Sequence, residues 1–156
     1  MYKKRLFMLI VFFMIFVTAT LAFSEVQLKK GQTVYVSAYP HVFLGPREII
    51  YDLAITLVIR NTDVKLPISV TSVDYYDMQG KLTKKFLSRP VILNPMASTY
   101  IHIKEKDTSG GIGSNFLVRW SAEKDVNVPV IEAVMIGGTS GQGISFISSG
   151  QEISEK

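Results

Sequence analysis

The chain has 156 residues, a length that suits one domain rather than two. It contains no cysteine, which excludes disulfides, thiol catalysis and thiolate metal sites. Lys3, Lys4 and Arg5 supply much of the formal net charge of +4. The rest of the chain is therefore nearly neutral, and nothing in it indicates the clustered basic face that nucleic-acid binding needs.

Residues 1–24 have the order of a secretory signal peptide. The basic head is followed by an unbroken apolar run over residues 6–17 and then by small and apolar residues. Ala22 and Ser24 suit the two positions that a signal peptidase reads, so cleavage is expected after Ser24 or, as a second choice, after Ala22. The alternative is an uncleaved anchor over residues 6–23, which is near the minimum length of a spanning helix. In both cases the remainder is expected in the periplasm or outside the cell, with the membrane touched only by this segment.

A polar tether is expected at residues 25–32, and the first strand after it. Residues 33–39 alternate between an apolar and a mixed face, which predicts a half-buried strand. The apolar face holds Val34, Val36 and Ala38. Prolines and a glycine interrupt residues 40–48, so a loop or an irregular edge is expected there.

Residues 49–60 give the clearest strand prediction, because apolar residues recur there at every second position. These residues are Leu53, Ile55, Leu57 and Ile59. The polar residues 61–63 should end the strand, since such side chains bond their own backbone in turns. Residues 68–76 predict the next strand, and a slip in its alternation between Val70 and Val73 suggests a bulge.

The second half of the chain continues in short strands. A turn at residues 77–80 leads into a polar strand, and prolines bracket a short apolar piece. The strands predicted after this turn cover residues 81–87, 91–93, 98–104, 116–122, 130–136 and 143–147. Gly137 and Gly138 are expected to stop the strand before them, and residues 149–156 should be a flexible tail.

No stretch after residue 25 keeps a helical period. Short strands separated by turn signals predict an all-β fold over residues 33–148. The expected architecture is an antiparallel β-sandwich of immunoglobulin-like type. A closed barrel is the alternative.

Two glycine-rich segments are the candidates for binding. Residues 107–116 and 139–146 each run through glycines into a strand with a phenylalanine. A phosphate loop is not expected, because no lysine follows the glycines and the next element is a strand. Either the glycines supply positive-φ turns, or the exposed polar groups contact a ligand or partner on one shared surface. The candidate binding residues are Asp107, Thr108, Ser109, Gly110, Asn115, Thr139, Ser140 and Gln142.

The titratable residues form no catalytic or metal-binding pattern. His41 and His102 lack a zinc-site spacing and are expected to be solvent-exposed. Asp74 and Asp77 would point to opposite faces of a strand and are too few for calcium. No serine lies in a GxSxG motif.

Glu132 is a charge within an apolar strand. If it is buried it must pair, and Arg119 or Arg60 could be its partner. A structural ion pair is expected here rather than a catalytic acid.

Several blocks together resemble the bacterial family called domain of unknown function 3124. They are residues 34–36 with Tyr39 and His41, residues 57–63, 68–81 and 107–120, and residues 131–136 through 143–146. The resemblance covers nearly all of the chain after the N-terminal segment. It implies an exported bacterial domain and supplies no activity or catalytic residue.

The predicted function is that of an exported, non-enzymatic β-sandwich that uses no cofactor or metal. It would bind a protein or small ligand of the cell envelope through its glycine-rich end loops. One alternative is an envelope enzyme whose carboxylates and histidines converge on folding. Its candidates are His41, Asp74, His102, Asp107, Glu123 and Glu132. The other alternative is a structural module that assembles through an exposed edge strand.

Overall fold

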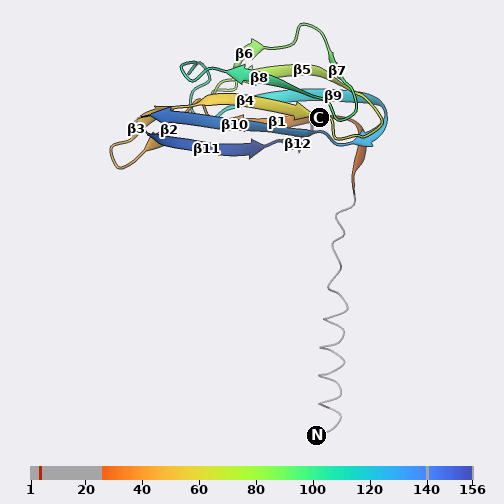
Figure 1. Cartoon of the computed structure of the whole chain (residues 1–156), viewed down its shortest axis with the longest axis horizontal. Coiled ribbons are helices and arrows are strands. Elements are labelled where there is room, and N and C mark those ends of the chain that lie inside the picture. Colours follow the sequence, from red (N-terminus) through yellow and green to blue (C-terminus); the bar gives the residue numbers. More distant parts are fainter. Residues whose placement is uncertain (1–3, 5–25, 140, 156) are drawn as a thin grey trace.

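The computed structural model describes residues 4, 26–139 and 141–155, so the expected signal segment lies outside it except for Lys4. Residues 26–139 and 141–155 form strands β1 to β12 and no helix (Figure 1). All their pairings are antiparallel. No helix in the described residues is long and apolar enough to cross a membrane. The prediction of an all-β fold of antiparallel sheets is confirmed.

The strands form two main sheets and a separate hairpin. The first sheet has the order β12-β1-β9-β5-β6, and β7 also pairs with β5. Its strands are β1 (Leu28–Ala38), β5 (Ile68–Tyr76), β6 (Leu82–Lys85), β7 (Val91–Leu93), β9 (Ser114–Asn127) and β12 (Gln151–Ile153). The second sheet has the order β11-β10-β4-β8. Its strands are β4 (Ala54–Arg60), β8 (Ser98–Ile103), β10 (Val130–Thr139) and β11 (Gln142–Ser149). The hairpin pairs β2 (His41–Leu44) with β3 (Ile49–Asp52).

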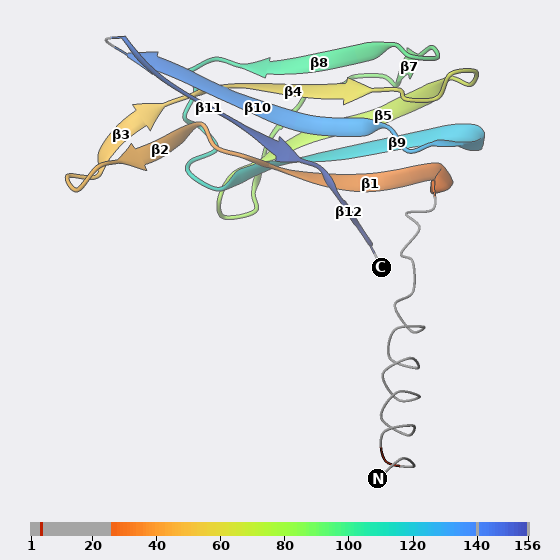
Figure 2. The ribbon, with the colours of Figure 1, turned by 60° about the horizontal axis from the view of Figure 1, so that its bottom comes forward.

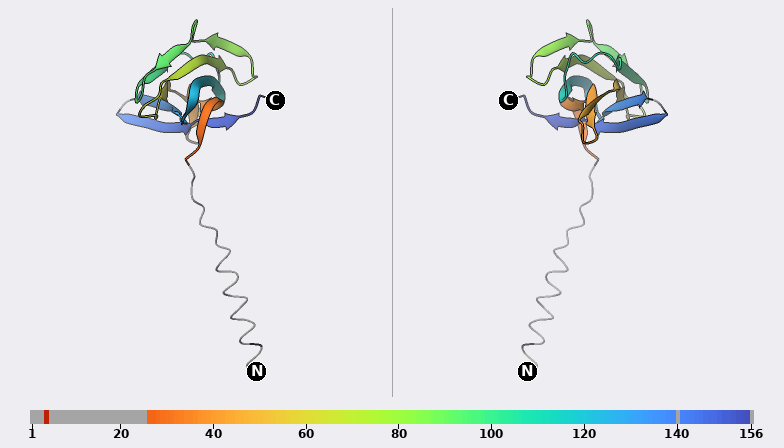
Figure 3. Two further views of the ribbon diagram at one scale, coloured as in Figure 1. Left: turned by 90° about the vertical axis from the view of Figure 1, so that its right-hand side faces the viewer. Right: turned by 90° about the vertical axis from the view of Figure 1, so that its left-hand side faces the viewer.

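The end-on views show the two sheets as layers (Figure 3), and one core of buried side chains lies between them. The alternating residues predicted to face inward are buried in it, because each strand turns every second side chain toward the opposite sheet. They include Val36, Ala38, Leu53, Ile55, Leu57, Ile59, Phe116 and Val118. Trp120 is buried as well, and its indole N–H donates to Gln32 Oε1 at 3.2 Å. The strand half of the segment 107–120 is therefore core.

Two irregularities shape the first sheet. The register of β5 on β9 shifts between Val70 and Ser72, so the predicted bulge is confirmed. The register of β1 on β9 also shifts, because Lys29 faces Val126 whereas Gly31 faces Ser121. Residues 122–125 of β9 therefore have no partner on β1 and stand out from the ladder.

The structure corrects two expectations about the chain ends. The expected tether contains the start of β1, which pairs Leu28 with Asn127. Gly31 permits this pairing, since a Cβ there would lie 2.8 Å from the carbonyl oxygen of Trp120. The expected tail contains β12, which pairs with β1 at Thr33 to Tyr35. The N-terminal segment is ordered because it pairs with β9, and the C-terminal segment is ordered because it pairs with the other edge of β1.

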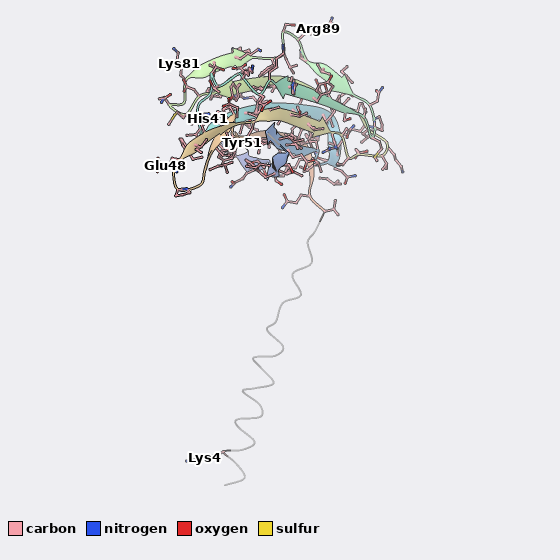
Figure 4. All side chains as sticks on the ribbon, turned by 60° about the vertical axis from the view of Figure 1, so that its left-hand side comes forward. Lys4, His41, Glu48, Tyr51, Lys81 and Arg89 are labelled. Carbon is pink, nitrogen blue, oxygen red and sulfur yellow. The ribbon has the colours of Figure 1, made fainter. Side chains whose placement is uncertain are left out.

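Two further expectations were wrong for reasons of packing. A loop or an irregular edge was expected at residues 40–48, but β2 forms a separate two-stranded hairpin with β3 that projects from one end of the molecule (Figure 4). Gly137 does not stop β10, which continues to Thr139. A Cβ on Gly137 would lie 2.6 Å from both the Asp52 carbonyl oxygen and a Leu53 methyl carbon. This glycine allows close approach of the hairpin base rather than ending the strand.

Candidate functional site

The glycine-rich loop before β9 uses much of its polar capacity internally. Asp107 Oδ1 accepts hydrogen bonds from Ser109 Oγ at 2.7 Å and from the Ser109 N–H at 3.3 Å. The Gly111 N–H donates to the Thr108 carbonyl at 3.0 Å. Thr108 and Ser109 are exposed, whereas Asp107 is half-buried. The loop is thus a self-bonded turn whose most exposed side chains are the short hydroxyls of Thr108 and Ser109.

Gly110 is a packing residue and not an exposed contact. It is buried, and its carbonyl accepts a hydrogen bond from the Met78 N–H at 3.0 Å. A Cβ at this position would lie 2.1 Å from the Tyr75 hydroxyl oxygen. That hydroxyl donates to Ser114 Oγ at 2.8 Å, and Ser114 Oγ donates to the Ala38 carbonyl at 3.0 Å. Desolvation by burial raises the pKa of Tyr75 above its usual range, so the group remains a neutral donor in this buried chain of bonds.

The other candidate residues are spread over both sheets. Asn115 lies on β9 in register with Ser37 and Tyr76, half-buried on the face turned away from the core. Thr139 and Gln142 are partners at the turn between β10 and β11, and Ser140 lies outside the described residues. Gly141 has a φ of 85° and Gly113 a φ of 87°, as the turn interpretation of both segments requires.

The two glycine-rich segments lie at the same end of the molecule but belong to different sheets (Figure 2). The first packs on Met78 in the turn between β5 and β6. The second closes the hairpin of β10 and β11 in the other sheet.

The charged side chains pair as structural residues do. Glu132 forms an ion pair with Arg60, which was one of its two expected partners. The other, Arg119, donates instead to Asp74 Oδ2 at 2.9 Å and to Glu155 Oε1 at 2.7 Å. The pKa of Arg119 is raised, chiefly by its hydrogen bond to Glu155. These pairs tie strands together across the outer faces of both sheets.

The histidines differ from one another. His102 is exposed, as predicted, and its Nδ1 lies 3.4 Å from Thr56 Oγ1. His41 is half-buried, and its Nδ1 atom is shielded from solvent and has no hydrogen-bond partner. The prediction of an exposed His41 was therefore wrong. The hairpin contributes to this burial, because β2 places His41 opposite Asp52 at the hairpin base, with its ring centroid 6.0 Å from that of Phe43. Among the described residues, no three His, Asp or Glu side chains are grouped to hold a metal.

A groove of about 400 Å³ lies on the first sheet. Its walls are the start of β5, the short strand β7 and the segment 122–125 of β9, which is unpaired with β1. The lining side chains that matter most are Leu66, Pro67, Ser69, Ile92, Ala122 and Lys124. Ile92 is 71% exposed although it is a large apolar residue. Groove size and apolar walls with a few polar groups are typical of ligand sites.

A buried hydrogen-bond network holds the rim of the groove. Asn61 Nδ2 donates to the carbonyls of Leu66, Leu93 and Asn94 at 2.9 to 3.1 Å. Asp63 Oδ1 accepts the N–H groups of Lys65 and Leu66, both at 2.9 Å. The predicted turn at residues 61–63 is therefore confirmed. It also fixes the backbone that presents Leu66 to the groove.

Asp63 should make stability depend on pH. Its pKa is lowered, first by the hydrogen bond from the Lys65 N–H and then by those from Asn127 and Leu66. The carboxylate thus stabilises the fold fully above the unfolded-state pKa of about 3.9. This contribution is lost as pH falls through the lower folded pKa.

Urea midpoints of the natural protein and Asp63→Asn, measured from neutral to acid pH, test this. The difference between the urea midpoints of the two proteins should be largest near neutral pH and should become smaller in acid. Glu152 and Glu155, whose pKa values are also lowered by hydrogen bonds from Lys29 and Arg119, remain in both proteins and cancel in the comparison. A gap that is independent of pH would refute the role given to the carboxylate.

Comparisons with known proteins place the chain in a family. The model of a family described as "Protein of unknown function (DUF3124)" matches residues 31–153. No curated protein matches the chain. A solved structure described as "Crystal Structure of Thermotoga maritima 1070" is similar at a TM-score of 0.46 and 12% identity, over 77% of this chain and 92% of that one.

Proposed function

The chain belongs to the family DUF3124, and we propose that it is an exported, non-enzymatic binding module. Its two sheets then form an immunoglobulin-like sandwich, and its residues 1–24 direct it to the periplasm or the cell exterior. Its ligand is a short extended peptide segment with an apolar side chain. The observation that carries this proposal is the groove of about 400 Å³ between β7 and residues 122–125 of β9.

The chemistry of the groove selects the ligand class. Pro67, Ile92 and Ala122 offer an apolar wall, and burying an exposed isoleucine against a ligand contributes about 1.5–3 kcal/mol. The hydroxyls of Ser69 and Ser121 can bond the peptide backbone. A volume of about 400 Å³ takes a few side chains and is far smaller than the face of a folded domain.

Charge at the groove supports the same ligand. Glu123 and Lys124 are adjacent, exposed and lie on one wall. One carboxylate and one ammonium complement the two ends of a peptide dipole or a pair of opposite charges on the ligand. A uniformly charged ligand such as a nucleic acid would meet one repulsive group there.

The geometry gives little support to the end loops as the binding surface. Gly110 packs against Tyr75, and Asp107 bonds to Ser109. The binding surface of the proposed module is therefore the groove and not the glycine-rich loops.

Selection from a random peptide library displayed on phage tests the proposal, with Ile92→Asp as the counter-selected variant. Peptides enriched on the natural protein should bind Ile92→Asp at least about tenfold more weakly, since the lost contact exceeds about 1.4 kcal/mol. Isothermal titration with the enriched peptide measures this.

Ile147→Asp is the matched control. Ile147 is 60% exposed on β11 of the second sheet, away from the groove. Its replacement should leave peptide affinity unchanged. The proposal fails if no peptide is enriched over the Ile92→Asp protein, or if both variants lose binding equally.

A further inference from the structure

The second sheet ends in an open edge at β8. This strand is paired on one side only, by β4, with Ile55 facing Ile103 and Arg60 facing Ser98. In Figure 2 it runs along the upper border of the molecule. An unpaired strand edge presents N–H and C=O groups that can template pairing with another chain.

The register identifies which backbone groups are free. The Asn61 N–H donates to the Ala97 carbonyl at 2.9 Å, and this pair continues the ladder of β4 on β8. Hydrogen-bonded pairs alternate along an antiparallel ladder, so Thr99, Ile101 and Ile103 bond to β4. The backbone groups of the intervening residues, Ser98, Tyr100 and His102, point to the open edge. No hydrogen bond within the described residues occupies them.

Two edge strands of the first sheet, β6 and β7, carry protections that β8 lacks. The exposed strand β6 includes Lys84 and Lys85, and β7 is short and lies between Pro90 and Pro95. Lysines, prolines and short strands discourage pairing between edges. The sequence of β8, Ser-Thr-Tyr-Ile-His-Ile, has no charged residue and no proline.

At the opposite edge of the second sheet, β11 leads through Gly150 into the first sheet. A Cβ on Gly150 would lie 2.6 Å from a Val34 methyl carbon. The C-terminal end of that edge therefore packs beside β1, whereas β8 is paired on one side only along its whole length.

We propose that β8 pairs with β8 of a second copy about a twofold axis at Tyr100. In this antiparallel register Tyr100 faces Tyr100 of the other copy and Ser98 faces His102. The free backbone groups of each pair then point toward the other copy. The pairing forms about six backbone hydrogen bonds and one continuous sheet across the two copies.

The side chains suit the twofold register. Tyr100 is 68% exposed on the outer face, and two such rings become a cross-strand aromatic pair. The small Ser98 lies opposite the larger His102. Lys104 falls opposite Met96 of the other copy, so the flanking lysines do not face each other.

The absence of cysteine from the chain allows a direct test. A hydrogen-bonded antiparallel pair has Cα atoms about 5.5 Å apart, which is within disulfide range. Tyr100→Cys should therefore give a covalent dimer on mild oxidation. Ile147→Cys, an exposed position on β11, should give much less dimer under the same conditions.

Sedimentation velocity over a range of concentrations is the second readout. The natural protein should show a concentration-dependent dimer, and Tyr100→Lys should be monomeric because two ammonium groups would face each other. A natural protein that is monomeric at every concentration would overturn the proposal. So would equal cross-linking at positions 100 and 147, or a dimer that survives Tyr100→Lys.

Discussion

Replacing Gly110 with alanine should destabilise the protein by about 3 kcal/mol, because the new methyl group overfills a closed site. Its Cβ would lie 2.1 Å from the Tyr75 hydroxyl oxygen and 2.6 Å from Ser114 Cβ. Both neighbours are buried and bonded to each other, so neither can move without losing the chain of hydrogen bonds that ends at Ala38. Urea denaturation measures the change as a lower midpoint with a similar slope.

Gly143→Ala is the control for this experiment. Gly143 also belongs to a glycine-rich segment, but a Cβ there meets only the Gly137 carbonyl oxygen, at an ordinary 3.7 Å. It should change the free energy of unfolding by less than about 0.5 kcal/mol. Equal effects at the two glycines would show that Gly110 is not held against Tyr75 as described.

Asn61→Ala should cost about 3 kcal/mol as well, by a different mechanism. The amide of Asn61 is the donor to three backbone carbonyls, and Asn61 Oδ1 accepts the Asp63 N–H at 2.9 Å. Asn61 is only 2% exposed, so water cannot readily replace these bonds. Each buried polar group left unpaired costs about 1–3 kcal/mol. Thermal unfolding should show a midpoint lower by about 10 °C.

Asn94→Ala serves as the comparison, because Asn94 contributes only its backbone carbonyl to this network and is exposed. It should unfold near the temperature of the natural protein. A small effect of Asn61→Ala, matching that of Asn94→Ala, would contradict the role assigned to the buried amide.

Local pattern was sufficient to predict the half-buried strands. In β4 the buried residues Ile55, Leu57 and Ile59 alternate with less buried ones, and this reflects one core face and one outer face, which is a property of the strand itself. The bulge near Val70 was predictable for the same reason, since an extra residue shifts the alternation.

Glycines and prolines were harder to interpret, because one residue type serves different purposes. Gly137 indicated a strand end, yet it is where β10 passes close to Leu53. Pro40 and Gly45 indicated a loop, yet they flank β2 of a hairpin whose tip holds Glu48 at a φ of 51°. Which purpose a glycine serves depends on a neighbour that is distant in sequence.

The groove could not be predicted from the sequence. It exists because the register of β1 on β9 leaves residues 122–125 unpaired beside β7. Ile92 belongs to an apolar piece between two prolines, and the sequence does not show which of its side chains faces outward. Gly110, in contrast, was named as a binding candidate, and its tertiary contact with Tyr75 shows it to be a packing residue.

Backbone amide chemical shifts, recorded while an enriched peptide is titrated into the protein, test the central claim most directly. If the groove is the binding surface, the largest changes should cluster at Ser69, Ile92, Ala122 and Lys124. The amides of Thr108 and Ser109 in the glycine-rich loop should stay in place. Large shift changes in that loop, with none at the groove residues, would contradict the claim and would identify the glycine-rich loop as the binding surface.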